Sequence, residues 1–418
     1  MQFVLASIYL FLIVLSFRKR KDLFSPLKVY LLTILVFWGK VFVVEYNFIT
    51  TLCFLAILLF GFFILIFEGN QKLVTNRKKI DFSNRSYIWK RLWLLTLIPL
   101  YFQYDLIQAM GGLERYIWSM GLRVVEWKGY GFHILMIRSI LVINLLYFVI
   151  IVKNKKNTPK EKIGFVANFS IYIILAFLTS SRSTLLVNIF LMMIIYYYNV
   201  KPIKFSKISL TAIGLILIAL ILGVARNGYG LEDGKLKTGL SNNSNKKIEL
   251  ANFSYGLFPL EKVTEEEYIK SYYYGKTYLS VITNLVPRKY WENKPPTGGV
   301  VFTKDYHDVH NGYSNYSTGI FVEGFINFGF FTGSAVSLII LILIYTLFFG
   351  YLNKNRMKTS SQKSVIFALV YPNLLFLLPT YLHGEFTTVT HTIFIQKILL
   401  ILIFTKIVIP KKNEFKRG

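Results

Sequence analysis

The sequence lacks most of the features on which soluble enzymes rely. It has one cysteine, Cys53, inside an apolar run, which excludes a disulfide framework and a thiolate metal site. Charged residues make up only 17% of the 418 residues, whereas 54% are hydrophobic. The sequence contains no phosphate-binding loop, no dinucleotide-binding glycine pattern and no nucleophile elbow. These absences argue against a soluble globular protein and against ATP-driven or dinucleotide chemistry.

Positive charge is plentiful, but its distribution does not favour nucleic acid as a partner. The formal net charge is +27, and most lysines and arginines stand in short clusters between apolar runs. Clusters of this kind mark the cytoplasmic loops of membrane proteins under the positive-inside rule. Apolar stretches of helix length recur from one end of the sequence to the other. The sequence therefore predicts an all-α polytopic membrane protein.

The basic clusters favour eleven transmembrane helices, with the amino terminus outside and the carboxyl terminus inside. This count places every cluster, such as "RKRK" at 18–21, on the cytoplasmic side. The predicted spans are residues 3–17, 27–44, 49–67, 89–106, 132–152, 163–178, 184–198, 208–225, 318–351, 365–381 and 388–409. The chain is thus organised as helices 1–8 in residues 1–225, a large extracytoplasmic loop in 226–317, helices 9–11 in 318–409 and a cytoplasmic tail in 410–418.

Two of the predicted spans fit the membrane poorly. Residues 318–351 are far more than the roughly 20 that a crossing helix needs. Gly329 and Gly333 interrupt this run, so we expect its first part to be a surface or re-entrant helix. Lys397 lies near the middle of the last span, where a charge is costly, which favours a later start for that helix.

Ionisable side chains gather at the outer end of the predicted ninth span. The stretch "YHDVHNGYSNYSTGIFVEGFINFGFFTG" at 306–333 contains His307, Asp308, His310 and Glu323. With Asp305 just before it, this cluster permits a metal site or a merely solvated loop, although no known metal spacing is matched. Acid–base chemistry or substrate binding fits better, since histidine exchanges protons near neutral pH. Glu385, in the turn "LHGEF", is a further carboxylate at the outer edge.

Arginines also lie at the outer membrane face. Arg182 stands in the tight turn "TSSRST", Arg226 begins the large loop, and Arg288 lies within it. A guanidinium group binds phosphate in a bidentate fashion and keeps its charge. Several of them near the interface would suit a lipid-linked diphosphate. The alternative is contact with lipid headgroups, which we favour for Arg138, about two turns inside its helix.

At these residues the sequence resembles the Wzy-type oligosaccharide repeat-unit polymerases, which are related to the O-antigen ligases. "SSRS" at 180–183 is similar to a short serine–arginine turn of that family, and "LVPRKYWENKPP" at 285–296 is similar to a segment of its large outer loop. "HNGYSNYSTGIFVEGFINFGFFTG" at 310–333 resembles the ligase pattern with the Asn-Phe-Gly variant of polymerases. "HGE" at 383–385 occupies a turn where many relatives carry Arg-Gly-acid.

The resemblance implies a GT-C-like fold with an active site at the outer face of the bacterial cytoplasmic membrane. It implies transfer of a growing glycan from undecaprenyl diphosphate onto a new lipid-linked repeat unit, without a cofactor or an obligatory metal. A flippase and a chain-length regulator are the implied partners, beside the membrane lipid. The expected catalytic residues are His310 and Glu323. The expected diphosphate- and glycan-binding residues are Arg182, Arg226, Arg288, Trp291, Lys294, His383 and Glu385.

Three other functions remain open from the sequence. A ligase would have nearly the same site but would transfer the polymer to another acceptor, and the Asn-Phe-Gly variant favours a polymerase. A flippase for lipid-linked oligosaccharides would be expected to show paired halves, which the sequence does not. A non-catalytic scaffold would leave the intramembrane and outer arginines without a role.

Overall fold

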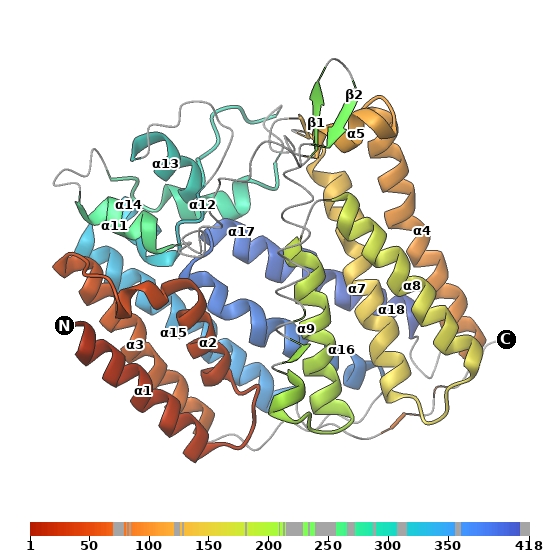
Figure 1. Ribbon diagram of the computed structural model, residues 1–418, viewed down its shortest axis with the longest axis horizontal. Helices are drawn as coiled ribbons and strands as arrows, with labels where there is room; N and C mark the ends of the chain where they lie inside the picture. Colours follow the sequence, from red (N-terminus) through yellow and green to blue (C-terminus); the bar gives the residue numbers. More distant parts are fainter. Residues whose placement is uncertain are drawn as a thin grey trace. The chain divides into compact units, whose positions relative to one another are not determined.

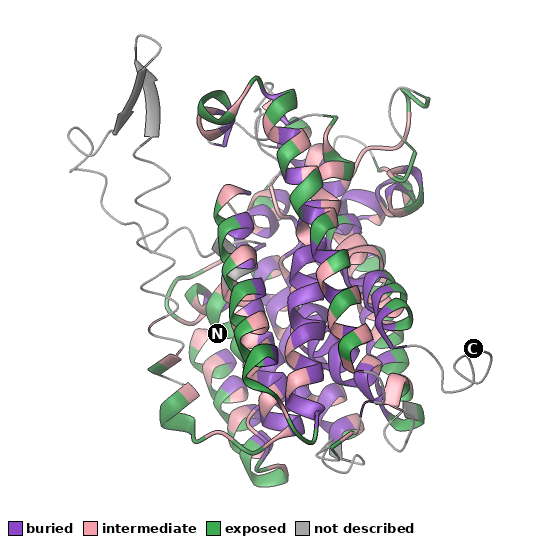
Figure 2. Ribbon diagram, turned by 90° about the vertical axis from the view of Figure 1, so that its right-hand side faces the viewer, coloured by how far each residue is buried: buried purple, intermediate pink, exposed green. Residues whose placement is uncertain are grey.

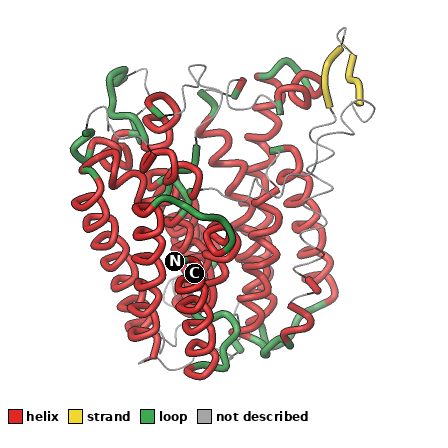
Figure 3. The backbone as a smooth tube through the Cα atoms, turned by 60° about the vertical axis from the view of Figure 1, so that its left-hand side comes forward, coloured by secondary structure: helices red, strands yellow, loops and turns green. Residues whose placement is uncertain are grey.

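Long apolar runs form long helices throughout the part of the chain that the computed structural model describes. The described residues are mostly helical, with one two-stranded hairpin (Figure 3). They are residues 1–69, 79–80, 82, 85–120, 126–127, 129–179, 182–208, 210–211, 214, 229–232, 235–238, 256–265, 272–286, 290–306, 316–355 and 361–409.

Seven segments of these described residues are long and apolar enough to cross a membrane. They are Gln2–Lys19, Phe48–Glu68, Gly131–Lys153, Pro159–Leu178, Phe330–Lys354, Ser361–Leu382 and Phe386–Val408. Exposed residues run along the outward faces of the helices (Figure 2). Many of them are large and apolar, among them Leu10, Ile174 and Leu347, as lipid-facing residues are. The chain is therefore a polytopic helical membrane protein, as its composition predicts.

Helices occupy ten of the eleven spans predicted from the sequence, with ends within a few residues of those expected. The remaining span, 208–225, lies mostly outside the described residues. The predicted break within 318–351 is confirmed at Gly329, where one helix ends and the next begins.

The chain divides into two compact units, each built from three separate segments. Unit 1 contains Met1–Leu73, Glu249–Asn355 and Leu374–Phe394, and unit 2 contains Val74–Ile248, Arg356–Asn373 and Ile395–Gly418. The elements of unit 1 are α1 (Gln2–Lys19), α2 (Pro26–Trp38), the 3₁₀ turn η1 (Gly39–Phe42), α3 (Phe48–Gly69), α11 (Leu257–Glu265), α12 (Lys276–Thr283), α13 (Gly298–Asp305), α14 (Ile320–Phe328), α15 (Phe330–Asn355), the 3₁₀ turn η3 (Leu378–Leu382) and α17 (Phe386–His391) (Figure 1).

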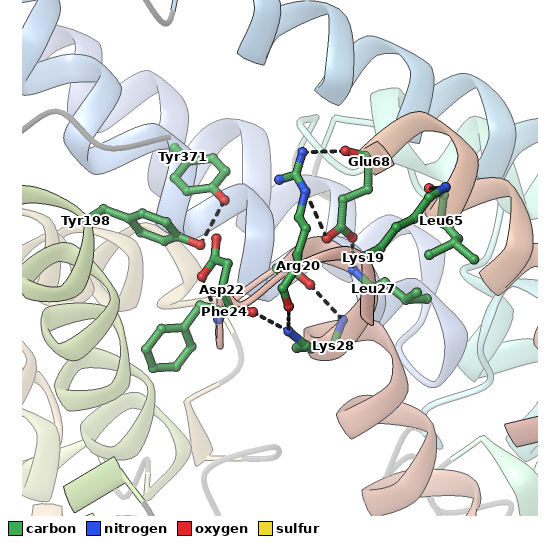
Figure 4. Close-up of polar contacts among 11 residues, drawn as sticks. Lys19, Arg20, Asp22, Phe24, Leu27, Lys28, Leu65, Glu68, Tyr198 and Tyr371 are labelled. Atoms are coloured by element: carbon green, nitrogen blue, oxygen red, sulfur yellow. Dashed lines mark hydrogen bonds and ion pairs between the residues drawn. The ribbon is translucent and has the colours of Figure 1, made fainter. Parts of the chain in front are cut away.

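A group of charged residues lies at one end of unit 1, where the chain passes from α1 to α2 beside the end of α3 (Figure 4). We call Lys19, Arg20, Lys28 and Glu68 the basic cluster. Nε of Arg20 lies 3.6 Å from Oε1 of Glu68, whose Oε2 accepts a hydrogen bond of 2.9 Å from the backbone N–H of Leu27. Lys28 Nζ donates to the carbonyl oxygen of Arg20, and Lys19 Nζ donates to that of Leu65. Three cations thus mark this end of the unit.

The pair α14 and α15 forms a tight helical hairpin around two glycines. Gly329 adopts a φ of +77° between the two helices, which explains the break. Gly333 does not interrupt α15, contrary to the sequence prediction, because it lies within that helix and touches the backbone of Gly324 on α14. A Cβ atom on Gly333 would overlap the carbonyl oxygen of Gly324. Ser337 adds a hydrogen bond of 2.9 Å to the carbonyl oxygen of Ile320.

Gly333→Ala is expected to destabilise the protein, since the new methyl group meets backbone rather than a movable side chain. Overpacking of this kind typically costs about 1–3 kcal/mol. The measurement is the melting temperature of the purified protein in detergent. Gly350→Ala is the matched control on the same helix, because a Cβ atom there meets nothing within 4 Å. Equal melting temperatures for the two variants would contradict the close packing of α14 against α15.

Unit 2 is held together by a chain of buried polar side chains. Its elements are α4 (Arg85–Ala109), α5 (Leu113–Ser119), α7 (Gly131–Lys153), α8 (Pro159–Leu178), α9 (Arg182–Asn199), the antiparallel strands β1 (Tyr229–Glu232) and β2 (Lys235–Thr238), the first part of α16 (Ser361–Leu377) and α18 (Leu400–Val408). Asn188 donates to Asn144, Asn144 to Asn168, and Asn168 to Thr96, over 2.9–3.0 Å. All four side chains are fully buried and come from four different helices. Hydrogen bonds between apolar helices of this kind help to fix their packing.

The helix of the last predicted span, 388–409, does not start later because of Lys397. A continuous helical segment runs from Phe386 through the π-helical part η4 (Thr392–Leu399) to the end of α18. Lys397 lies within η4 and is only 7% exposed, so the protein covers its charge without shortening the helix. The predicted span 388–409 is therefore confirmed, and the later start suggested by Lys397 is wrong, because a side chain covered by protein escapes the lipid that makes it costly.

Candidate functional site

Two glutamates that the sequence singles out come together in unit 1. Glu323 lies in the first turn of α14, and Glu385 is the residue directly before α17. Both are buried, with 0% exposure for Glu323 and 9% for Glu385. We call these two residues the carboxylate pair.

Glu323 accepts hydrogen bonds from three segments of unit 1. Its Oε1 accepts from the backbone N–H of Phe386 at 2.6 Å and from the hydroxyl of Thr318 at 3.3 Å. Its Oε2 accepts from the hydroxyl of Thr277 on α12 at 3.2 Å. The carboxyl group therefore joins α12, the start of α14 and the first residue of α17.

Glu385 binds the start of α13 through a hydrogen bond. Its Oε1 accepts a hydrogen bond of 2.8 Å from the backbone N–H of Gly299, in the first turn of that helix. Its Oε2 accepts from the hydroxyl of Thr388. A carboxylate is favoured at this place because the amide groups of a helix amino terminus carry partial positive charge.

Further hydroxyl and amide groups surround Glu323. Asn327, one turn along α14, donates to the Thr277 hydroxyl at 2.6 Å, and its own Oδ1 accepts from the N–H of Gly275 at 2.8 Å. On the next turn of α12, the Ser280 hydroxyl meets the Thr387 hydroxyl of α17. Polar groups in such a network hold each other in place, which fixes the position of the carboxyl group.

Two glycines of α13 lie directly against the carboxylate pair. Gly298 and Gly299 begin α13, and a Cβ atom on Gly298 would overlap the Cδ of Glu323. A Cβ atom on Gly299 would lie 3.0 Å from Oε1 of Glu385 and 2.5 Å from the carbonyl oxygen of Tyr316. The two glycines allow α13 to approach both carboxyl groups.

The surroundings change the proton affinity of Glu323. Burial, and after it the charge of Glu385, raises the pKa of Glu323 from its ordinary value of 4.5 to about 8. The donors at Phe386, Thr277 and Thr318 oppose part of this rise, because they stabilise the charged form. Glu323 thus holds a proton at neutral pH and can exchange it near that pH. Such a group, enclosed and next to a second carboxylate, is typical of acid–base chemistry.

The raised pKa predicts that the protein is more stable in acid. Between pH 4.5 and about 8, the folded protein keeps a proton on Glu323 that the unfolded chain releases. The free energy of unfolding therefore falls with rising pH in this window, by up to about 1.4 kcal/mol per pH unit. Melting temperatures measured across this range should show the decline, and Glu323→Gln should flatten it. A wild-type decline that persists in Glu323→Gln would assign it to another group.

His383 lies two residues before Glu385 and is held in an apolar setting. Its ring stacks on Phe37 of α2, with ring centres 3.7 Å apart and planes 19° from parallel. Burial lowers the pKa of His383 to about 4, so the imidazole is neutral at physiological pH. Its buried Nε2 atom has no hydrogen-bond partner among the described residues. A neutral ring whose Nε2 atom has no partner among the described residues suits a hydroxyl group better than a phosphate.

The other predicted site residues are spread more widely or are not described. Trp291 is 43% exposed, and Lys294 donates to the carbonyl oxygen of Val286 at 3.0 Å. Arg182 is the first residue of α9, and its side chain lies outside the described part of the chain. Arg226, Arg288 and His310 lie outside the described residues as well.

The metal alternative is addressed only in part by the structure. Asp305 accepts a hydrogen bond of 2.7 Å from the Tyr273 hydroxyl, whereas His307, Asp308 and His310 lie outside the described residues. Within the described ranges, the histidine, cysteine, aspartate and glutamate side chains form no group of three or more that could hold a metal ion.

Sequence reasoning missed the residues that place the carboxyl groups. Thr277, Asn327 and the glycines Gly298 and Gly299 carry no motif by themselves. A signal was present in α12, where Thr277, Ser280 and Thr283 recur every third residue in an otherwise apolar and aromatic run. That spacing puts three hydroxyl groups on one face of a helix.

Comparisons with protein-family models, with curated proteins and with solved structures find no match to this chain.

Proposed function

We propose that this protein is a Wzy-type glycan polymerase. It transfers a growing glycan from undecaprenyl diphosphate onto a new lipid-linked repeat unit at the outer face of the bacterial cytoplasmic membrane. The proposal includes the eleven-helix GT-C-like topology. The observation that carries it is the carboxylate pair, because Glu323 and Glu385 were selected from the sequence independently and lie together in the structure.

The basic cluster supports an outer location for the carboxylate pair. The two groups lie at opposite ends of α3 in unit 1. Glu68, near the last residue of α3, binds Arg20, whereas Asn47, next to its first residue, donates to Thr264 of α11 at 2.8 Å. Gly256, at the start of α11, in turn touches His383 beside the pair. A helix of 22 residues is about 33 Å long, which matches the thickness of a membrane. Because cations are typical of the cytoplasmic side, this arrangement supports an outer location for the pair.

The reaction needs a base and a site for negative charge. In the proposed step, a sugar hydroxyl of the new unit attacks the anomeric carbon of the growing glycan. The new carbon–oxygen bond forms while the bond from that carbon to the diphosphate oxygen breaks. Undecaprenyl diphosphate leaves with the bonding electrons, and the hydroxyl proton passes to the carboxylate of Glu323. Arg182, Arg226 and Arg288 stabilise the diphosphate charge, with His310 assisting at the hydroxyl.

The burial of Glu323 imposes a condition on this role. A sugar hydroxyl reaches the carboxyl group only when a covering segment moves away. Of the segments around it, α13 lies against the pair with Gly298 and Gly299, and we infer that α13 is the segment that moves. In the proposal, Trp291 and Lys294, in the segment before α13, contact the glycan. When the covering segment moves, the Nε2 atom of His383, which is buried and has no hydrogen-bond partner among the described residues, can supply a further polar contact.

The proposal is tested with purified protein and synthetic undecaprenyl-diphosphate repeat units in liposomes. A ladder of products that differ by one repeat unit supports a polymerase. Transfer of a preformed polymer to another acceptor without a ladder indicates a ligase, and movement of repeat units between leaflets without a new bond indicates a flippase. Protein that melts cooperatively but produces no ladder overturns the proposal.

A further inference from the structure

The short helix α12 has its polar face inside and its apolar face outside. Thr277, Ser280 and Thr283 are buried, with 0%, 0% and 8% exposure. Leu279 and Ile282, on the opposite face, are 55% and 69% exposed. A surface helix in water shows the reverse arrangement, because its apolar side packs on the core.

The buried polar face is explained by the carboxylate pair. Thr277 donates to Glu323, and Ser280 contacts Thr387. Between them, the ring of Tyr278 packs edge-on against Phe386, with ring centres 5.1 Å apart. These contacts fix which side of α12 faces the protein, and the apolar side with Leu279 and Ile282 stays exposed.

The apolar surface continues beyond α12. Exposed apolar and aromatic residues precede and follow the helix over a short stretch of sequence, and exposed apolar patches usually mark an interaction site. We call them, with Leu279 and Ile282, the α12 patch. Its remaining members are Tyr272, Tyr274, Leu285, Val286, Tyr290 and Trp291.

The neighbours of α12 are the ends of membrane-spanning segments. His391, on α17, donates a hydrogen bond of 2.6 Å to the carbonyl oxygen of Val281. The backbone N–H of Tyr274 donates to the carbonyl oxygen of Asn327, three residues before α15 begins. Both α15 and α17 begin candidate membrane spans. Each span carries an exposed apolar residue near its start, Phe331 on α15 and Phe394 on η4 after α17. The α12 patch is therefore continuous with a lipid-facing surface.

The composition of the patch fits the boundary of a bilayer. Tyrosine and tryptophan are enriched where acyl chains meet headgroups, since their rings are apolar and their polar ends stay hydrated. The exposed Lys276 stands beside them, where it can meet the phosphate groups of lipids. Apolar residues toward acyl chains, with aromatic and basic residues at the edge, define a helix that lies in the interface.

We propose that α12 lies within the outer leaflet, with Leu279 and Ile282 against acyl chains and Tyr290 and Trp291 among the headgroups. The occupant of the α12 patch is membrane lipid rather than a protein partner. In this arrangement α12 alone separates the lipid from Glu323 on that side. The choice of the outer leaflet rests on the orientation given with the proposed function. The contact of α12 with lipid depends on the placement of α12 alone, so it holds whether or not the protein is a polymerase.

The test places a nitroxide spin label at Ile282 and measures its collisions with oxygen and with a water-soluble nickel complex. Ile282→Cys is made in the full chain with Cys53→Ser, purified, and reconstituted in vesicles of phosphatidylcholine and phosphatidylglycerol. Oxygen is enriched among acyl chains and the nickel complex in water. We expect oxygen collisions to prevail at Ile282, as at the lipid-facing control Phe331→Cys. Lys304→Cys, exposed at the end of α13, should show the opposite preference by several-fold.

Each other outcome overturns the proposal. A label at Ile282 that collides mainly with nickel places α12 in water, and one shielded from both reagents indicates that protein covers it. Leu279→Cys repeats the measurement on the same face if Ile282→Cys does not fold. The assay contains no glycan substrate, so its failure is distinct from a failure of the polymerase proposal.

Discussion

Glu323→Gln is expected to lower the polymerisation rate by about 10²–10⁴-fold, the contribution usual for a general base. Glutamine keeps an oxygen that can accept from Phe386 and Thr318, but it cannot take a proton. The fold should therefore persist while the transfer step fails. Initial rates are measured on lipid-linked repeat units, alongside the melting temperature. Glu265→Gln, on an exposed carboxylate of α11, is the control and should retain the wild-type rate.

The pH dependence of the rate separates a base from a positioning residue. A base must be deprotonated before it acts, so the wild-type rate should rise with pH until about 8, the pKa of Glu323. The residual activity of Glu323→Gln should lose this rise. If the variant keeps both the wild-type rate and its pH profile, Glu323 has no catalytic role, and His310 or Glu385 becomes the better candidate.

Gly298→Ala is expected to reduce the rate at least tenfold, on the order of 1.4 kcal/mol of transition-state stabilisation. The added methyl group occupies the place of the Glu323 side chain, which cannot turn away because hydrogen bonds hold it on several sides. Either the carboxyl group leaves its donors or α13 moves away from Glu385. Either displacement disturbs the carboxylate pair, and we expect the membrane helices to stay unchanged.

A double-mutant cycle makes this expectation specific. If Gly298→Ala acts through Glu323, adding it to Glu323→Gln should cause little further loss, because the two changes affect one interaction. Losses that multiply would instead show that the glycine matters for another reason, such as the movement of α13. Gly350→Ala, at an open position of α15, serves as the control for glycine replacement.

The sequence predicts the helices well because their ends have local causes. The run 49–67 is apolar throughout, and α3 occupies Phe48–Gly69. The break at Gly329 is also local, since a residue with positive φ ends a helix wherever it occurs. These helix ends can be predicted without knowing how the helices pack against one another.

The candidate site was predictable only in part, because its geometry depends on distant segments. Glu323 and Glu385 stand out as carboxylates at the predicted outer ends of apolar runs, yet nothing in the sequence states that they meet. The inverted α12 is the clearest case. Its Leu279 and Ile282 would ordinarily be assigned to a core, and only the placement of Thr277 against Glu323 shows which face is inside. The roles of Arg182, Arg226, Arg288 and His310 stay predictions.

The interleaved construction of the two units has a consequence for biosynthesis. Each unit takes its last segment from residues beyond 355, namely Leu374–Phe394 for unit 1 and Ile395–Gly418 for unit 2. The ribosome therefore delivers α14 into the membrane long before the N–H of Phe386 exists to bind Glu323. In the interval the glutamate lacks this amide donor, and incompletely paired helices invite quality-control proteases. A nascent chain that stops after α15 leaves both units unfinished, so we expect it to be degraded rather than to accumulate as half a protein.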